Sequence, residues 1–303
     1  MEGMGLGRVW VVFAVAAVPL GCARHGRAGT AERAAPGPKA ARSSAAEPAT
    51  VVGRTLRLGC NEWQPYVGAA GAPEEGFAVD LTREALRRMG WKLDFRTRPW
   101  ARCLEEMRRG TLDGVLCAYN VPERRWVFGR VPLGLGPEWS DEFVVLRGKG
   151  SSWRYRSPED LKSARLALVS GYVYPEPIAG RLRAGGSGLA LVTGDDPTTR
   201  LLELVAMGRA EATVEQRLPL EAVLSSRPDL RSKVEEVGTL PGWRVYVALR
   251  PDYPNAEAVM RELDRSLLGV YRSAEFGRIL GRYGLRPAAS APGPTAGRQV
   301  PAP

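Results

Sequence analysis

The side chains best suited to molecular recognition lie between Leu56 and Arg124, where aromatic residues repeatedly follow short apolar runs. These aromatic residues are Trp63, Tyr66, Trp100 and Tyr119. Their ring faces suit apolar groups and cations. Because an open α/β sheet binds small molecules at the carboxyl ends of its strands, the pattern predicts a small-molecule site along one sheet edge. For Trp63, Tyr66 and Trp100, plain core packing is the alternative.

The single histidine narrows the chemistry that the folded body can perform. His25 falls within residues 23–53, which are rich in Ala, Gly, Pro and Ser and which we expect to form a disordered tether. A histidine base, a Ser-His or Cys-His pair and a His-ligated metal site are therefore excluded from the folded body. Glu62 and Glu215 are the candidate acid–base groups, but no catalytic constellation accompanies them. We expect a protein that is not an enzyme and needs no metal or cofactor.

The net charge of +10 raises the question of a nucleic-acid partner. The basic residues are mostly arginines spread along the chain, without the Lys/Arg-rich run that marks a nucleic-acid patch. We therefore expect no nucleic-acid partner.

The N-terminus predicts export. Arg8 precedes an apolar segment at 9–20 that is too short for a comfortable membrane span, and Gly21 and Cys22 follow it. Leu20-Gly21-Cys22 resembles a bacterial lipobox, so we expect residues 1–22 to be a signal peptide and Cys22 to carry a lipid. An ordinary secretory signal cut nearby is the alternative. Export leads to the periplasm with a lipid anchor, or to secretion if the lipobox is not used.

The elements that must position the aromatic residues alternate between strand and helix patterns, which predicts an α/β fold with a mostly parallel sheet. Strands are expected at 56–59, 91–96, 114–118, 142–146, 165–169, 210–214 and 245–249. Helices are expected at 81–89, 101–109, 201–207, 256–266 and 274–283. Asp80 is expected to cap the first helix, and Ser157-Pro158 to open a second unit. Residues 288–303 have the composition of a disordered tail.

Short motifs occur in this body in a characteristic order. They are Pro65-Tyr66, the segment 76–81, Pro99-Trp100, the segment 110–113, Pro122-Glu123-Arg124, the segment 157–162 and the segment 208–212. Their order over residues 54–285 resembles bacterial extracellular solute-binding protein family 3, the polar amino-acid-binding components of ABC importers. The resemblance implies a two-lobe periplasmic-binding-protein fold of type II, in which helices flank each sheet. Lobe 1 would hold 54–146 plus 243–287 and lobe 2 would hold 147–242, joined by a hinge that closes on ligand.

The resemblance also implies ligand-binding residues. Arg124 matches the arginine that forks onto a ligand carboxylate, a pairing that lysine cannot copy. The implied set comprises Trp63, Tyr66, Trp100, Tyr119, Arg124, Ser170, Gly171, Tyr172, Glu215 and Gln216. The turn at Ser170-Gly171-Tyr172 would offer backbone N–H groups to an anion. Gln216 replaces the aspartate that usually holds the α-amino group, and the adjacent Glu215 points to the other face of a strand.

The implied function is capture of a small polar, carboxylate-bearing solute, an amino acid or a relative, by a monomer that delivers it to an ABC permease. Two alternatives stay open. One is a sensory or regulatory module that is not coupled to transport. The other is a periplasmic dehydratase-like enzyme on the same fold.

The cysteines of the folded body, Cys60, Cys103 and Cys117, all fall near the expected ligand-facing edge of lobe 1. An oxidising compartment favours a disulfide, and their odd number leaves one thiol free. We expect a Cys60–Cys103 disulfide, with Cys60–Cys117 as the next pairing and three unpaired thiols as the alternative.

Overall fold

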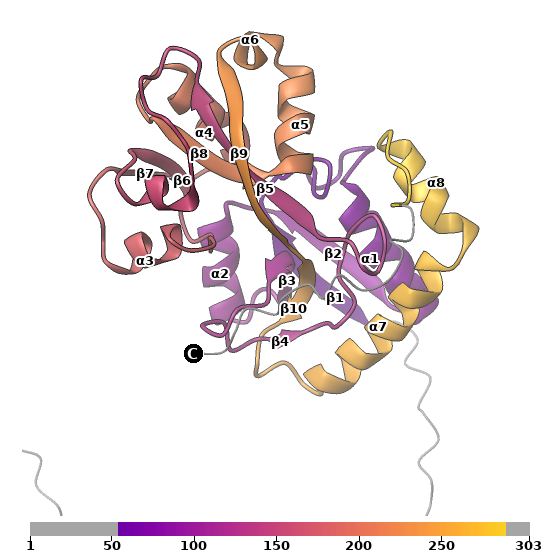
Figure 1. Cartoon of the computed structure of the whole chain (residues 1–303). Coiled ribbons are helices and arrows are strands. Elements are labelled where there is room, and N and C mark those ends of the chain that lie inside the picture. Colours follow the sequence, from indigo (N-terminus) through magenta and orange to yellow (C-terminus); the bar gives the residue numbers. More distant parts are fainter. Residues whose placement is uncertain (1–53, 289–303) are drawn as a thin grey trace, which may run out of the picture. The chain divides into compact units, whose positions relative to one another are not determined.

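The computed structural model describes residues 54–288, which form two five-stranded sheets with helices packed on them (Figure 1). The predicted signal peptide, the predicted lipidation site at Cys22, the predicted tether and most of the predicted tail lie outside the described residues. We call the first sheet and its helices lobe 1. Its sheet has the order β2-β1-β3-β10-β4, with β1 (Thr55–Cys60), β2 (Lys92–Thr97), β3 (Gly114–Tyr119), β4 (Val127–Phe128) and β10 (Val245–Leu249). Its helices are α1 (Phe77–Arg88), α2 (Trp100–Arg108), α7 (Ala256–Tyr271) and α8 (Ala274–Arg282).

Lobe 2 contains the second sheet, in the order β7-β6-β8-β5-β9. Its strands are β5 (Asp141–Gly148), β6 (Leu166–Val169), β7 (Leu189–Val192), β8 (Ala212–Gln216) and β9 (Val234–Trp243). Its helices are α3 (Ile178–Arg183), α4 (Pro197–Ala206), α5 (Arg217–Ser226) and α6 (Pro228–Arg231), with a 3-10 turn η1 (Pro158–Lys162). Ser157 opens that turn in a capping box with Asp160, as its sequence predicts.

Both sheets are mixed, but in each of them four strands run in one direction and a single strand runs against them, which agrees with the prediction of mostly parallel sheets. The crossovers through helices make β1 parallel to β2 and β3, and β6 parallel to β7 and β8. The strands that connect the lobes run against them: β10 is antiparallel to β3 and β4, and β5 is antiparallel to β8 and β9. β5 also belongs to the second sheet, although its residues 141–146 were expected in lobe 1. Its pairing along β9 holds it there, from Asp141 opposite Trp243 to Gly148 opposite Val234.

Two links join the lobes. Residues 129–140 connect β4 to β5, whereas Arg244 alone separates β9 from β10. The sequence did not predict β9, because Gly238, Pro241 and Gly242 and several charged residues give it the composition of a loop.

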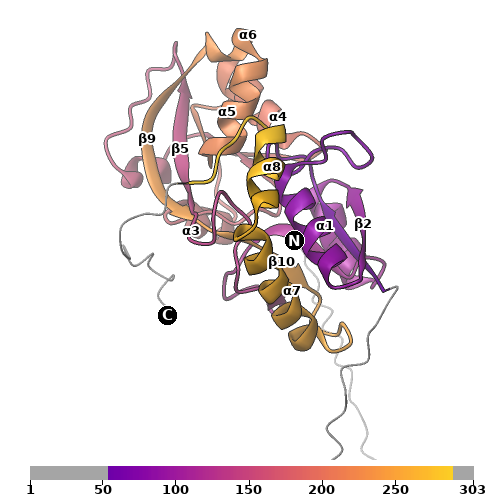
Figure 2. The same cartoon turned by 90° about the vertical axis from the view of Figure 1, so that its right-hand side faces the viewer.

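The helices of lobe 1 pack by apolar faces that recur every three or four residues. α7 buries Val259, Met260, Leu263, Leu267 and Val270, and it packs against α1 beside α8 (Figure 2). α1 begins at Phe77, four residues earlier than expected, so Asp80 lies inside its first turn and does not cap it. Instead Asp80 accepts a hydrogen bond from the Tyr283 hydroxyl at 2.6 Å and pairs with Arg282 at 2.9 Å. None of the helices within residues 54–288 has the length and apolar character that crossing a membrane requires.

The parallel strands place the candidate residues together. Because β1, β2 and β3 point the same way, the residues at and after their carboxyl ends share one edge of the sheet. That edge brings together Cys60 at the end of β1, Trp63 after it, Trp100 at the start of α2, and Tyr119 at the end of β3.

Candidate functional site

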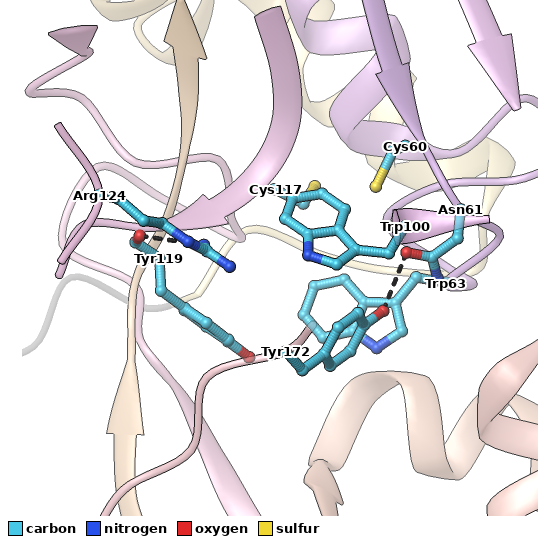
Figure 3. A pocket seen from close by; sticks show the side chains of 8 residues that line it. All are labelled: Cys60, Asn61, Trp63, Trp100, Cys117, Tyr119, Arg124 and Tyr172. Carbon is cyan, nitrogen blue, oxygen red and sulfur yellow. Dashed lines mark hydrogen bonds between the residues drawn. The ribbon is translucent and has the colours of Figure 1, made fainter. Parts of the chain in front are cut away.

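A cavity that is partly open to solvent, with about 290 Å³ of empty space when the adjoining solvent is included, lies at this edge, and Tyr172 of lobe 2 lines it from the opposite side (Figure 3). Its lining consists of Cys60, Asn61, Trp63, Trp100, Cys117, Tyr119, Arg124 and Tyr172. Four of the eight lining residues are aromatic, and the one charged group is a guanidinium.

Arg124 holds that charge without a carboxylate partner among residues 54–288. Its guanidinium lies over the rings of Trp100 and Trp126, at 5.3 and 4.8 Å from their centroids. It donates only two long hydrogen bonds, to the carbonyl oxygens of Tyr119 at 3.3 Å and Gly171 at 3.5 Å. Burial lowers the pKa of Arg124 to about 10, so it remains protonated at neutral pH. A guanidinium has five N–H donors, so this cation can still receive an anion.

Aromatic rings form the walls around this cation. Trp100 and Tyr172 meet edge to face with centroids 6.0 Å apart. Tyr119 meets Trp243 in the same way at 5.2 Å, and Trp63 stacks on Tyr66 at 4.8 Å. Such walls favour a ligand with an apolar or aromatic body.

The wall residues also hydrogen-bond across the two lobes. Trp100 Nε1 donates to the Gly171 oxygen at 2.9 Å, and the Tyr172 hydroxyl donates to Asn61 Oδ1 at 3.0 Å. Trp63 Nε1 donates to Glu215 Oε1 at 3.3 Å. Because each bond joins an element of lobe 1 to one of lobe 2, separating the lobes breaks all three.

Glu215 is buried behind the cavity wall and does not line it. Only 4% of its surface is exposed. Besides Trp63, its carboxylate accepts hydrogen bonds from Thr198 Oγ1 at 3.1 Å and the Gln216 amide at 2.8 Å. Burial raises the pKa of Glu215 to about 7, even though these hydrogen bonds oppose the shift.

Gln216 is fully buried at the junction of β5 and β9. Its Nε2 donates to the carbonyl oxygens of Asp141 and Trp243, each at 3.2 Å, while its Oε1 has no partner among the described residues. Asp141 accepts a hydrogen bond from the Leu218 amide at 3.0 Å, and burial raises the pKa of Asp141 to about 7. Tyr66 contacts the same carboxylate at 3.5 Å. This group of residues ties the strands together outside the cavity.

The structure thus brings together some of the predicted site residues and separates others. Lining the cavity are Trp63, Trp100, Tyr119, Arg124 and Tyr172, whereas Tyr66, Ser170, Gly171, Glu215 and Gln216 lie outside its lining. The amides of Ser170 and Tyr172 donate to the carbonyl oxygens of Val192 and Val169, so this turn does not hold them free for an anion. It is the Gly171 carbonyl that faces Arg124 and Trp100.

Sequence reasoning missed two contributors. Asn61 follows β1 directly, and its position after a predicted strand was the available signal. Trp126 lies two residues beyond Arg124 and supports its guanidinium from a second side.

The expected Cys60–Cys103 disulfide is absent, because all three cysteines of the described chain are free and buried. A Cβ on Gly59 would lie 3.1 Å from Cys103 Sγ, so Cys103 packs on the face to which Gly59 points. Side chains alternate along a strand, and Cys60 therefore faces the opposite side. Cys117 has a left-handed backbone with φ of 55°, and together with Cys60 it lines the cavity.

A second cavity of about 630 Å³ shares Trp63 with the first and is lined by Glu62, Asp196 and parts of α4 and α5. Burial, and then the nearby charges of Asp196 and Asp195, raise the pKa of Glu62. No group of three or more His, Cys, Asp or Glu side chains within residues 54–288 is arranged to hold a metal ion.

Comparisons with known proteins agree with this architecture. The profile of the bacterial extracellular solute-binding proteins, family 3, matches residues 56–284. A histidine kinase sensor domain similar to periplasmic binding proteins aligns at a TM-score of 0.62 and 19% identity, covering 78% of this chain and 98% of its own. The arginine-, lysine-, histidine-binding protein ArtJ of Geobacillus stearothermophilus aligns at 0.62 and 16%, covering 77% and 96%. An ancestral arginine-binding protein aligns at 0.60 and 19%, covering 76% and 97%.

A search of curated protein sequences gave no match. The structural matches confirm the predicted two-lobe fold. Since the family profile spans both lobes, from β1 to the end of α8, the chain belongs to the bacterial extracellular solute-binding proteins, family 3.

Proposed function

We propose that this protein captures a small carboxylate-bearing solute between its lobes and delivers it to the permease of an ABC importer. The observation that carries the proposal is Arg124, a cation in an aromatic cavity with N–H donors to spare and no carboxylate partner in residues 54–288. The ligand carboxylate would accept hydrogen bonds from this guanidinium. The ligand body would pack against Trp100, Tyr119 and Tyr172.

Lobe separation gives the ligand its entry. The bonds of Trp100, Trp63 and Tyr172 across the lobes would break on opening and re-form around the ligand. Similarity to proteins described as binding arginine supports a role in solute capture. The family's extracellular location supports export, and we propose lipidation of Cys22 as the anchor.

A sensory role is the second candidate, because one similar structure is the sensor domain of a histidine kinase. Co-purification with a permease would favour transport. If the protein does not co-purify with a permease but binds a signalling protein specifically, sensing would be favoured. A dehydratase-like activity has less support, because Glu215, whose pKa of about 7 would suit a proton carrier, does not line the cavity.

The test of carboxylate binding compares Arg124→Ala with Arg125→Ala, since Arg125 is the exposed neighbouring arginine. A panel of small carboxylates would be titrated by calorimetry and by thermal shift. Thermal shift detects a ligand because binding to the folded state raises the free energy of unfolding by RT ln(1 + [L]/Kd). We expect Arg124→Ala to weaken binding about 30-fold or more, equivalent to about 2 kcal/mol or more. Arg125→Ala should bind as the unchanged protein does. Equal binding by both variants would remove Arg124 from the site and refute the proposal.

A further inference from the structure

The charge of the cavity restricts the ligand more closely than the fold does. Among the described residues that line it, Arg124 is charged and the others are Cys, Asn, Trp and Tyr. The walls therefore supply one positive charge and no negative one. A carboxylate ligand neutralises this cation, whereas a zwitterion brings a second positive charge for which the lining has no counter-ion.

An α-ammonium group cannot escape to an acidic region elsewhere. Its nitrogen is only two bonds from the carboxylate carbon, so it must stay beside Arg124 and within the same cavity. The acidic residues Glu62 and Asp196 line the second cavity instead. They could receive a distant cationic group but not an α-ammonium.

The nearest buried carboxylates are already engaged. Glu215 accepts hydrogen bonds at both oxygens, from Trp63 and the Gln216 amide at Oε1 and from Thr198 at Oε2. Asp141 does not line the cavity, and its Oδ2 accepts hydrogen bonds from the Leu218 amide and the Tyr66 hydroxyl. Asn61 Oδ1, a polar acceptor in the lining, already receives the Tyr172 hydroxyl. An ammonium placed here would lose its hydration without gaining a charged acceptor.

We infer that, if the proposed function holds, the ligand is a carboxylic acid with an apolar or aromatic body and no α-ammonium group. Two neutral thiols and four aromatic rings complete a lining suited to such a body. The corresponding α-amino acids are the class that the cavity rejects.

The test uses matched pairs of ligands that differ by the amino group: propionate and alanine, 4-methylpentanoate and leucine, 3-phenylpropionate and phenylalanine. Each would be titrated into the exported protein by calorimetry, with 3-phenylpropionamide as the uncharged control. For the pair that binds, we expect the desamino acid to bind at least about tenfold more tightly than its amino acid. The amide should not bind.

Asn61→Asp provides the converse test, because it places a carboxylate in the lining while keeping the acceptor for Tyr172. It should change the ratio of the two affinities, that of the desamino acid to that of its amino acid, by about tenfold or more in favour of the amino acid. Asn255→Asp, which adds the same charge at the start of α7, is the matched control and should leave the ratio unchanged.

The outcomes separate this inference from the proposed function. If amino acids bind as tightly as their desamino partners, and Arg124→Ala loses this binding, the inference is overturned and carboxylate capture stands. Binding that survives in Arg124→Ala, or no binding by any carboxylate in the set, would overturn both.

Discussion

Glu215 makes the stability of this protein depend on pH in an unusual direction. Burial raises its pKa from 4.5 to about 7 in the folded state. Between these values the unfolded chain has released the proton while the folded protein still holds it. The folded state therefore binds more protons, and its stability falls as the pH rises from about 4.5 to 7, then levels off.

The magnitude follows from the shift. Each pKa unit corresponds to about 1.4 kcal/mol, so ionising Glu215 in place costs about 3 kcal/mol of folding free energy at pH 8. Glu215→Gln removes this cost while keeping acceptors for Trp63 and the Gln216 amide. We expect the variant to gain about 3 kcal/mol relative to the unchanged protein between pH 4.5 and pH 8.

The assay is urea unfolding of both proteins at several pH values, with the difference in unfolding free energy plotted against pH. Taking the difference removes the contributions of distant titrating groups that both proteins share, whereas Asp141, whose charge helps to raise the pKa of Glu215, remains coupled to the change. Glu138→Gln, an exposed carboxylate on the surface, controls for the loss of any negative charge. A difference that stays constant with pH, or that shrinks as the pH rises, would refute a buried carboxyl with a raised pKa.

Three further predictions test the site and its support. Trp100→Phe removes the donor to the Gly171 oxygen and should lower the unfolding free energy by about 1 kcal/mol in urea titrations, and no change would contradict an ordered bond between the lobes. Gly114→Ala places a Cβ 2.1 Å from the Ala248 oxygen and should cost roughly 1–3 kcal/mol by the same measurement, which a neutral effect would refute. Burial raises the pKa of all three described cysteines, that of Cys103 to about 12, so iodoacetamide should modify them only after unfolding; rapid native labelling or a disulfide in the mass spectrum would contradict this.

The sequence predicts most of lobe 1 and the aromatic character of the sheet edge at which the cavity lies. Apolar runs placed β1, β3 and β10 within a residue of their observed bounds, because buried strands need continuous apolar residues. Arg124 was identifiable from its motif, and Trp100 from its place after a strand. Pattern alone could not show that Trp126 supports the guanidinium, because that contact depends on how a loop folds back.

The remaining differences arise where the two lobes meet. Glu215 and Gln216 are adjacent in sequence, yet one bonds Trp63 of lobe 1 and the other bonds the crossing strands. Such hydrogen-bond partners are fixed by tertiary packing, and no periodic pattern in the sequence predicts them. The Cys60–Cys103 pairing failed for a related reason, because strand alternation puts the thiols on opposite faces and proximity in the predicted order does not reveal this.

The unequal links between the lobes constrain how they can move. Arg244 is the whole connection on one side, and Gln216 holds the ends of β5 and β9 together just before it. A single residue spans less than about 4 Å, so the two sheets cannot slide apart along this side. We therefore expect relative motion to be a swing about Arg244. The other link, residues 129–140, is longer, and its first part is anchored to lobe 1 because the amides of Gly129 and Leu133 donate to the oxygens of Val247 and Val245. A swing of this kind moves the mouth of the cavity much further than it moves Arg244. A proline or a cross-link at Arg244 would therefore alter the rates of ligand exchange without contacting the ligand.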